Sequence, residues 1–79
     1  MKQRKIMLPS ITIAKEFVKE AGKCDFDINV FYNRIVIDAK SLLGVLSLDL
    51  TRVLTVEYNG DNDEFEELLD ELEKNIAVA

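Results

Sequence analysis

Apolar and polar residues follow two different periods along the chain. Alternation with a period of two, which is typical of half-buried strands, occurs at residues 25–30, 34–38 and 52–58. A further strand is expected over residues 3–8 and ends at Pro9, because proline has no N–H to donate to a strand ladder. Residues 31–34 are predicted to form a tight hairpin connection. Asn33 tolerates a positive φ there, but its usual partner glycine is missing, so the turn is expected to differ from the commonest type.

A period near 3.6, which indicates an amphipathic helix, occurs at residues 11–22 and again from residue 63 to about residue 75. Ser10 precedes the first helix as a typical N-cap, and residues 61–63 offer several N-caps for the last one. Acidic residues coat the rest of the last helix, which predicts a solvated face. The stripes expected to face the core are Ala14, Phe17, Val18 and Ala21 in the first helix and Phe65, Leu68, Leu69, Leu72 and Ile76 in the last.

A short apolar helix is predicted in the middle of the chain, from Ser41 to about residue 48, with Ser41 as its N-cap. Five large apolar residues follow Ser41, which is too many for one buried face. The helix is therefore expected to carry both a core face and an exposed contact face. Gly44 lowers its helix propensity by about 1 kcal/mol relative to alanine and lets another surface approach closely. The five apolar residues are Leu42, Leu43, Val45, Leu46 and Leu48.

The order of elements is therefore β-α-β-β-α-β-α. This order predicts a single α+β domain over residues 1–79, in which helices cover one face of a sheet and water covers the other. A chain of this length buries roughly 60% of the surface that its unfolded form exposes, so the core is small.

Composition excludes several classes of function. A net charge of −5, with basic residues scattered apart from Lys2, Arg4 and Lys5 at one strand end, argues against nucleic acid as the partner. No apolar run reaches the ~20 residues that span a membrane, and the N-terminus lacks a signal-peptide core, so a cytoplasmic protein is expected. Cys24 is expected to be a packing residue in a reducing compartment. Without histidine, an activated cysteine, a phosphate loop or a metal cluster, no enzyme activity, cofactor or metal is expected.

Three segments resemble the HPr family, the small phosphocarrier proteins of the bacterial sugar phosphotransferase system. Residues 14–21 are similar to the family's first helix, and residues 27–33 to its second strand and turn. Residues 39–48 (AKSLLGVLSL) are similar to the regulatory-serine segment of Gram-positive members. The resemblance covers the chain after Pro9. It implies an open-faced β-sandwich, a four-stranded antiparallel sheet with three helices on one face.

The histidine that carries phosphate in this family is missing. Members place it at the start of the first helix, in a His-x-Arg-Pro segment. Counted from the helix, the histidine position falls on Ser10, the arginine position on Thr12 and the proline position on Ile13. A phosphoramidate on imidazole suits reversible transfer, whereas a serine phosphoester is far more inert. The resemblance therefore implies a member that has no catalytic residue and cannot transfer phosphate through histidine. Asp49 also departs from the family, which usually has glycine there.

What remains of the family's features implies a regulatory docking protein. HPr-like proteins of carbon catabolite repression lack the histidine but keep the serine. HPr kinase phosphorylates that serine, and the phosphorylated form binds a transcriptional regulator. Ser41 matches the serine, and Lys40, Leu42, Leu43 and Leu46 are the expected partner-binding residues. Two alternatives stay open: Ser41 only caps its helix, or the chain is a paralogous scaffold without phosphorylation, including a homodimer formed through the leucines.

Overall fold

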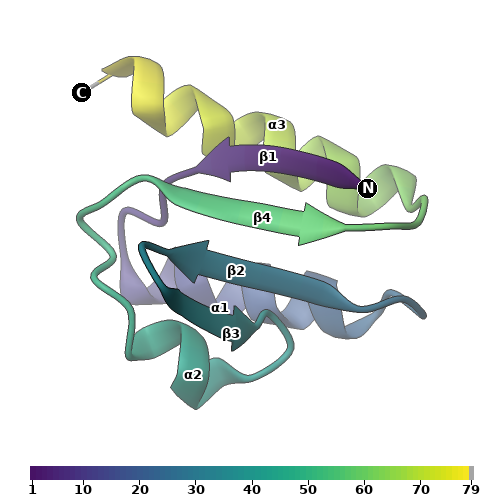
Figure 1. Ribbon diagram of the computed structural model, residues 1–79. Coiled ribbons are helices and arrows are strands. Elements are labelled where there is room, and N and C mark those ends of the chain that lie inside the picture. Colours follow the sequence, from purple (N-terminus) through teal and green to yellow (C-terminus); the bar gives the residue numbers. More distant parts are fainter. Residues whose placement is uncertain (79) are drawn as a thin grey trace.

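The computed structural model describes the backbone of residues 1–78 and the side chains of residues 1–76. Four strands form one antiparallel sheet in the order β1-β4-β2-β3; α1 and α3 lie behind it, and α2 lies beside β3 (Figure 1). This is the expected α+β fold, an open sheet with three helices, and its elements follow the predicted order. Their bounds are β1 (Lys2–Ile6), α1 (Ile11–Gly22), β2 (Ile28–Tyr32), β3 (Ile35–Asp38), α2 (Leu42–Leu46), β4 (Leu54–Tyr58) and α3 (Asp63–Val78).

The central strand β4 organises the core, because it pairs with both β1 and β2. Its alternate residues Leu54, Val56 and Tyr58 are buried, as the period of two predicts. Phe65 of α3 packs edge-on against Tyr58 with ring centroids 5.6 Å apart, and Phe17 of α1 lies 5.9 Å from Phe65. These aromatic contacts join both long helices to the middle of the sheet.

The first strand is shorter than predicted because the backbone that follows it forms hydrogen bonds with α3. The strand expected over residues 3–8 ends at Ile6. Beyond it, the Met7 N–H donates to the Leu72 carbonyl at 3.3 Å, and Asn75 Nδ2 donates to the Met7 carbonyl at 3.1 Å. Leu8 is fully buried although it lies outside the sheet. The apolar character of these residues was therefore a signal of burial and not of strand pairing.

Other bounds also differ from the predictions. The second strand begins at Ile28 and not at residue 25, because Phe26 leaves the ladder and stacks on Tyr58 with centroids 6.0 Å apart. β4 begins at residue 54 and not at 52, α2 spans only residues 42–46, and α3 runs past residue 75. In the hairpin, Asn33 alone has a positive φ, 56°, so Arg34 avoids the left-handed region and the turn differs from the common type with two such residues.

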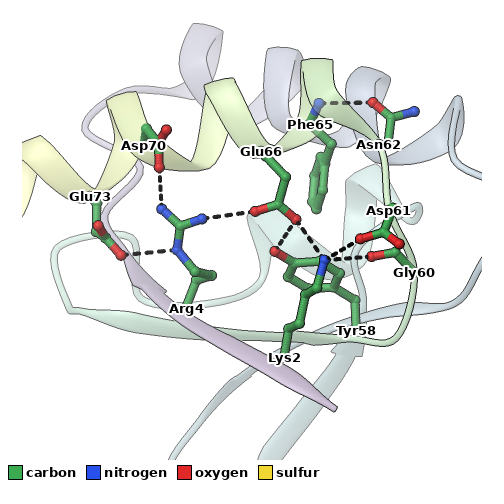
Figure 2. Close-up of polar contacts among 10 residues, drawn as sticks. All are labelled: Lys2, Arg4, Tyr58, Gly60, Asp61, Asn62, Phe65, Glu66, Asp70 and Glu73. Carbon is green, nitrogen blue, oxygen red and sulfur yellow. Dashed lines mark hydrogen bonds and ion pairs between the residues drawn. The ribbon is translucent and has the colours of Figure 1, made fainter.

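A set of ion pairs fastens the edge strand β1 to α3 (Figure 2). The Arg4 guanidinium lies 2.9 Å from Glu66 Oε1, 2.5 Å from Asp70 Oδ1 and 3.1 Å from Glu73 Oε1. The hydrogen bonds that Arg4 donates to Glu73 and Asp70 raise the pKa of Arg4. The Tyr58 hydroxyl donates to Glu66 Oε2 at 2.5 Å. Part of the acidic coat of α3, predicted to be a solvated face, is therefore engaged by the sheet.

Lys2 extends the same network to the loop after β4. Its ammonium lies 2.6 Å from Asp61 Oδ1 and donates to the Gly60 carbonyl at 3.1 Å (Figure 2). It also lies 5.5 Å from the centroid of the Tyr58 ring. Asn62 caps α3, since its Oδ1 accepts a hydrogen bond from the Phe65 N–H at 2.9 Å. The basic residues at the start of the chain thus hold the fold together.

Candidate functional site

Ser41 begins the short helix α2 and is exposed. Its Oγ accepts a hydrogen bond from the Gly44 N–H at 3.2 Å, so the predicted N-cap is present. Its own N–H donates to the Asp38 carbonyl at 2.9 Å. The hydroxyl oxygen is therefore held at the helix terminus by one donor and is still reachable from solvent.

The apolar residues of α2 divide between the core and the surface. Val45 is fully buried and Leu48 nearly so. Leu42 and Leu46 are half-buried, and Leu46 packs against the core. Leu43 is 83% exposed, more than any other large apolar side chain among the described residues. The expected core face and an exposed apolar face are both present, and Leu43 is the most exposed residue of the second; that this face contacts a partner stays a prediction.

Gly44 sets how closely α2 can approach the sheet. A Cβ at this position would lie 2.7 Å from Ile37 Cγ2 of β3 and 3.1 Å from Ser41 Oγ. The sequence predicted a close approach at Gly44, and the approaching surface belongs to the protein itself. Any larger side chain would push α2 away from β3, together with the exposed serine and leucines.

Lys40 fixes the segment before Ser41. Its Nζ donates to the Cys24 carbonyl at 2.9 Å, and its backbone N–H donates to Asp38 Oδ1 at 2.9 Å. The side chain is half-buried, so its amine is already engaged within the fold. A partner-binding role for Lys40 stays a prediction, whereas its contact with Cys24, just after α1, ties down the residue that precedes Ser41.

Ser10, which is predicted to occupy the position of the family histidine, has the geometry of an ordinary helix cap. Ser10 Oγ accepts from the Ile13 N–H at 3.1 Å, and the Ser10 carbonyl accepts from the Ala14 N–H at 2.9 Å. Thr12 is exposed, and Ile11 is 60% exposed. The hydroxyls of Ser10 and Thr12 therefore stand where the family resemblance predicts a histidine and an arginine.

Asp49 organises the connection from α2 to β4, a role that the sequence did not predict. Its Oδ1 accepts from the Thr51 hydroxyl at 2.6 Å and from the Thr51 N–H at 3.1 Å, and its Oδ2 lies 3.4 Å from Arg52 Nε. The hydrogen bonds from Thr51 lower the pKa of Asp49. The spacing of Asp49, Thr51 and Arg52 is typical of an Asx-type turn and was the available signal.

Cys24 is buried, and its thiol donates weakly to the Glu20 carbonyl at 3.6 Å. Burial raises the pKa of the thiol, which disfavours the reactive thiolate. Within residues 1–78, no group of three or more His, Cys, Asp or Glu side chains is arranged to hold a metal ion. Across the same described residues, no helix combines the length and the apolar character needed to cross a membrane.

The fold and the site define a small α+β protein that presents a short capped helix with an exposed leucine. The sequence profile of the HPr family, described as the phosphorylation site of the HPr component of the phosphotransferase system, matches residues 11–77. The chain therefore belongs to the HPr family. The match begins directly after Ser10, the residue that the sequence resemblance predicts at the histidine position.

Solved structures agree with this assignment. HPr-C-His of Thermoanaerobacter tengcongensis is 27% identical with a TM-score of 0.75, covering 94% of this chain and 92% of its own. The histidine-containing phosphocarrier protein of Mycoplasma has a TM-score of 0.71 at 17% identity, with 96% of each chain covered, and supports the fold. The Bacillus subtilis catabolite repression containing protein Crh is 25% identical with a TM-score of 0.59, covering 85% of this chain and 77% of its own. No curated protein matched in a direct sequence comparison.

Proposed function

We propose that this chain is a regulatory docking protein related to the sugar phosphotransferase system and does not carry phosphate on histidine. Its partner-binding face consists of Ser41, Leu42, Leu43 and Leu46, with Lys40 at its margin. One observation supports the proposal most strongly: Leu43 is 83% exposed on a helix whose N-cap, Ser41, is also exposed. An exposed large apolar side chain beside a modifiable hydroxyl suits a protein partner.

Phosphorylation of Ser41 would switch this face. A phosphoryl group adds a charge of about −1.5 to −2 at pH 7 and three acceptor oxygens. Those oxygens can replace the hydroxyl as acceptors for the Gly44 N–H, which now lies 3.2 Å from Ser41 Oγ. The first turn of α2 contains no acidic side chain that would repel the added charge. The modified face would therefore keep its helix and present an anion next to Leu43.

Likeness to relatives supports a regulatory role. The solved Crh structure is named for catabolite repression, and it overlaps 85% of this chain. We propose that HPr kinase modifies Ser41 and that the phosphorylated form binds a transcriptional regulator in the cytoplasm of a sugar-importing bacterium. In this proposal the chain itself is not an enzyme and needs no cofactor.

Incubation with HPr kinase and ATP, followed by intact mass measurement, tests this role. We expect a gain of roughly 80 Da, the mass of one phosphoryl group. Ser41→Ala should abolish the gain, whereas Ser47→Ala should keep it. Ser47 is a matched control, because it is exposed and its hydroxyl bonds to the Gly44 carbonyl at the other end of α2. A product that survives Ser41→Ala would contradict the assignment.

Two further measurements test the docking face and the proposed inability to carry phosphate on histidine. Phosphoenolpyruvate with the first enzyme of the phosphotransferase system should leave no acid-labile phosphate on this chain. Calorimetric titration of the phosphorylated chain with the regulator should detect binding, and Leu43→Ser should abolish it. Val53→Ser is the control, since Val53 is an exposed apolar residue outside the face, at 40% exposure.

A paralogous scaffold is the second candidate. The observation that favours it is the hydrogen bond between Ser41 Oγ and the Gly44 N–H, because capping alone explains a serine at this position. In this case the leucines of α2 bind an unmodified partner or a second copy. The kinase would give no mass gain, and Leu43→Ser would still abolish partner binding.

A further inference from the structure

The helices leave one face of the sheet uncovered. α1 and α3 lie behind the sheet in Figure 1. α2 contacts the sheet on the same side, because Gly44 packs on Ile37, and Ile37 points in the same direction as its buried neighbour Val30. Among residues 1–78, no helix therefore lies over the opposite face, which we call the open face.

Two rows of side chains cross the open face, with one residue from each strand in each row. These residues alternate along their strands with residues that point to the helices, and each row follows the strand order β1, β4, β2, β3. The strand register therefore determines which residues lie side by side. The first row is Lys5, Thr55, Phe31 and Val36, and the second row is Gln3, Glu57, Asn29 and Asp38.

The first row contains an apolar patch. Phe31 is half-buried, and Val36 beside it is 61% exposed. The water-facing side of an antiparallel sheet is usually polar, so an aromatic ring beside an exposed valine departs from the common pattern. The two rows carry one basic and two acidic side chains, whereas the whole chain has a net charge of −5. The open face therefore combines apolar surface with little net charge.

We propose that the open face packs against the open face of a second copy of the chain, about a two-fold axis that runs parallel to the strands between β4 and β2. Two sheets that pack in this way lie about 10 Å apart, with their strands within about 30° of each other. The axis places β1 over the second copy's β3, and β4 over the second copy's β2. Each contact then occurs twice by symmetry.

The first row is complementary to itself in this arrangement. Thr55 lies over the second copy's Phe31, so both rings are covered near the axis. Lys5 lies over the second copy's Val36, where its methylene stem contacts the valine. The ammonium of Lys5, which now donates to Thr55 Oγ1 at 3.2 Å, can then reach the second copy's Asp38 in the neighbouring row. Apolar contacts in the middle are thus flanked by an ion pair on each side.

The second row adds hydrogen bonds between amides and carboxylates. Gln3 lies over the second copy's Asp38, and Glu57 lies over the second copy's Asn29. A carboxylate accepts several hydrogen bonds, so Glu57 can bond to that amide and keep the hydrogen bond that it accepts from Gln3 at 2.7 Å. In this arrangement no carboxylate of the two rows lies over another carboxylate.

Charge selects this axis over one that is perpendicular to the strands. A perpendicular axis through the first row would place Lys5 over the second copy's Lys5. Through the second row, it would place Glu57 over the second copy's Glu57, and between the rows it would place Val36 over the second copy's Asp38. Like charges repel, and a carboxylate covered by an apolar side chain loses water without gaining a partner. The open face is therefore complementary to itself in one orientation, which favours a second copy as its occupant.

The other acidic residues of the chain stay far from this contact. α3 carries Asp63, Glu64 and Glu66 in its first turn, and it lies on the helix side of its own sheet. In the dimer the two α3 helices are separated by two sheets, which are themselves about 10 Å apart, whereas the Debye length is about 8 Å at physiological ionic strength. α2 also faces away from the contact, so the dimer does not depend on its docking role and leaves Leu43 accessible.

The contact is small, so we expect weak association. Four strands at a spacing of about 4.8 Å, each with about five residues at about 3.4 Å, give a face of roughly 300 Å² per copy. This area is at the low end for specific complexes, and we expect a reversible dimer with a Kd between about 100 μM and 1 mM. Sedimentation equilibrium from about 20 μM to 2 mM covers this range.

Two charge substitutions test the placement of β1 over β3. Lys5→Glu brings a carboxylate to the second copy's Asp38, and Val36→Lys brings a lysine to the second copy's Lys5. Each should weaken association at least about tenfold, because like charges repel. An equimolar mixture of the two variants should associate at least as strongly as the parent, because the introduced carboxylate at position 5 then lies over the introduced lysine at position 36. Lys15→Glu is the matched control, since it makes the same charge change at an exposed position of α1 and should leave the dimer intact.

Nuclear Overhauser effects locate the contact in the parent chain. Lys5 and Val36 lie on the two outer strands, three strand spacings or about 14 Å apart within one copy. A signal between their side chains therefore reports the dimer alone, and we expect it at about 1 mM. A chain that is monomeric at about 2 mM would overturn the proposal. So would a mixture that fails to associate although thermal scans show both variants to be folded, or a dimer that is lost in Leu43→Ser, because the leucines of α2 would then make the contact.

Discussion

At one edge of the sheet, β1 is held to α3 by a guanidinium that contacts three carboxylates, and the Arg4 side chain is only 21% exposed. At the other edge, β3 and α2 contact each other through Ile37 and Gly44 and leave Leu43 and Val36 open to water. The first edge partly buries a charged side chain, and the second exposes apolar surface. Both arrangements depart from the usual preference, in which charged side chains are exposed and large apolar side chains are buried.

The difference separates residues that hold the fold from residues that are available to other molecules. Partly buried charges with several partners lose stability when one partner is removed, because the remaining charges are left unpaired. Exposed apolar side chains contribute little to the stability of the fold. They stabilise a complex when a partner covers them. Substitutions of the Arg4 network at the β1 edge should therefore change stability. Substitutions of the exposed apolar residues of α2 should change binding.

Arg4→Ala should give the largest loss of stability in this comparison, about 2–3 kcal/mol, because it leaves Glu66 without its main cation and removes the buried stem of the side chain. Urea unfolding measures the free energy of unfolding. Lys74→Ala is the control, since Lys74 pairs only with Glu71 and its side chain is 71% exposed, so the loss should stay within about 0.5 kcal/mol. Equal losses of unfolding free energy in the two variants would show that the Arg4 network contributes no more stability than one surface ion pair.

Tyr58→Phe should cost about 1–2 kcal/mol at neutral pH, because it removes the hydrogen bond from the Tyr58 hydroxyl to a charged acceptor, Glu66. The ring and its contact with Phe65 are kept in the variant. The same unfolding measurement applies. Tyr32→Phe is the matched control, as Tyr32 is half-buried and has no such acceptor among the described hydrogen bonds. If the Tyr58→Phe variant is as stable as the parent, the hydrogen bond from Tyr58 does not contribute, and the Arg4 ion pairs alone stabilise this edge.

Stability should also fall at alkaline pH because of Tyr58. Burial, and then its hydrogen bond to Glu66, raise the pKa of Tyr58 above its ordinary value near 10. A raised pKa means that the folded state keeps a proton that the unfolded state releases. The resulting stabilisation is complete below about pH 10 and is lost above it, at up to about 1.4 kcal/mol per pH unit. Tyr58→Phe should remove this slope, and a slope unchanged in that variant would assign it to other groups.

Local features were the part of this molecule that the sequence could predict. The buried stripes of α1, β4 and α3 follow from periods within single segments, and the caps Ser10 and Ser41 need only a hydroxyl three residues before an N–H. The family assignment also depended on contiguous motifs. Each of these features involves residues close together in the chain, so no knowledge of the fold was needed to find them.

Contacts between distant segments escaped prediction for the same reason. The Arg4 contact with Glu66 spans 62 positions, so the sequence showed only a basic strand end and an acidic helix face. The end of β1 was misplaced because the backbone of Met7 bonds to α3, a partner that no local pattern reveals. At Gly44 the sequence indicated a close approach, but only the fold identified Ile37 as the neighbour.

Gly44→Ala tests that contact and should destabilise the protein by about 1 kcal/mol. Alanine favours a helix by about 1 kcal/mol, but crowding against the Ile37 methyl group at 2.7 Å costs more, because a β-branched side chain cannot easily move aside. Chemical denaturation of the double variant provides the control. Ile37→Leu removes the branching methyl, so Gly44→Ala in that background should be neutral or stabilising. A destabilisation that persists there would locate the strain elsewhere.

Leu43→Ser should have the smallest effect on stability, within about 0.5 kcal/mol, because Leu43 is 83% exposed and loses few contacts. Val45→Ala, two residues further along the same helix, should cost about 2 kcal/mol, since Val45 is fully buried. Thermal unfolding of both variants compares the two faces of α2. If Leu43→Ser unfolds like the parent protein and yet loses partner binding, the leucine serves recognition alone. A loss of stability equal to that of Val45→Ala would instead make α2 a purely structural element and remove the physical basis for a docking face.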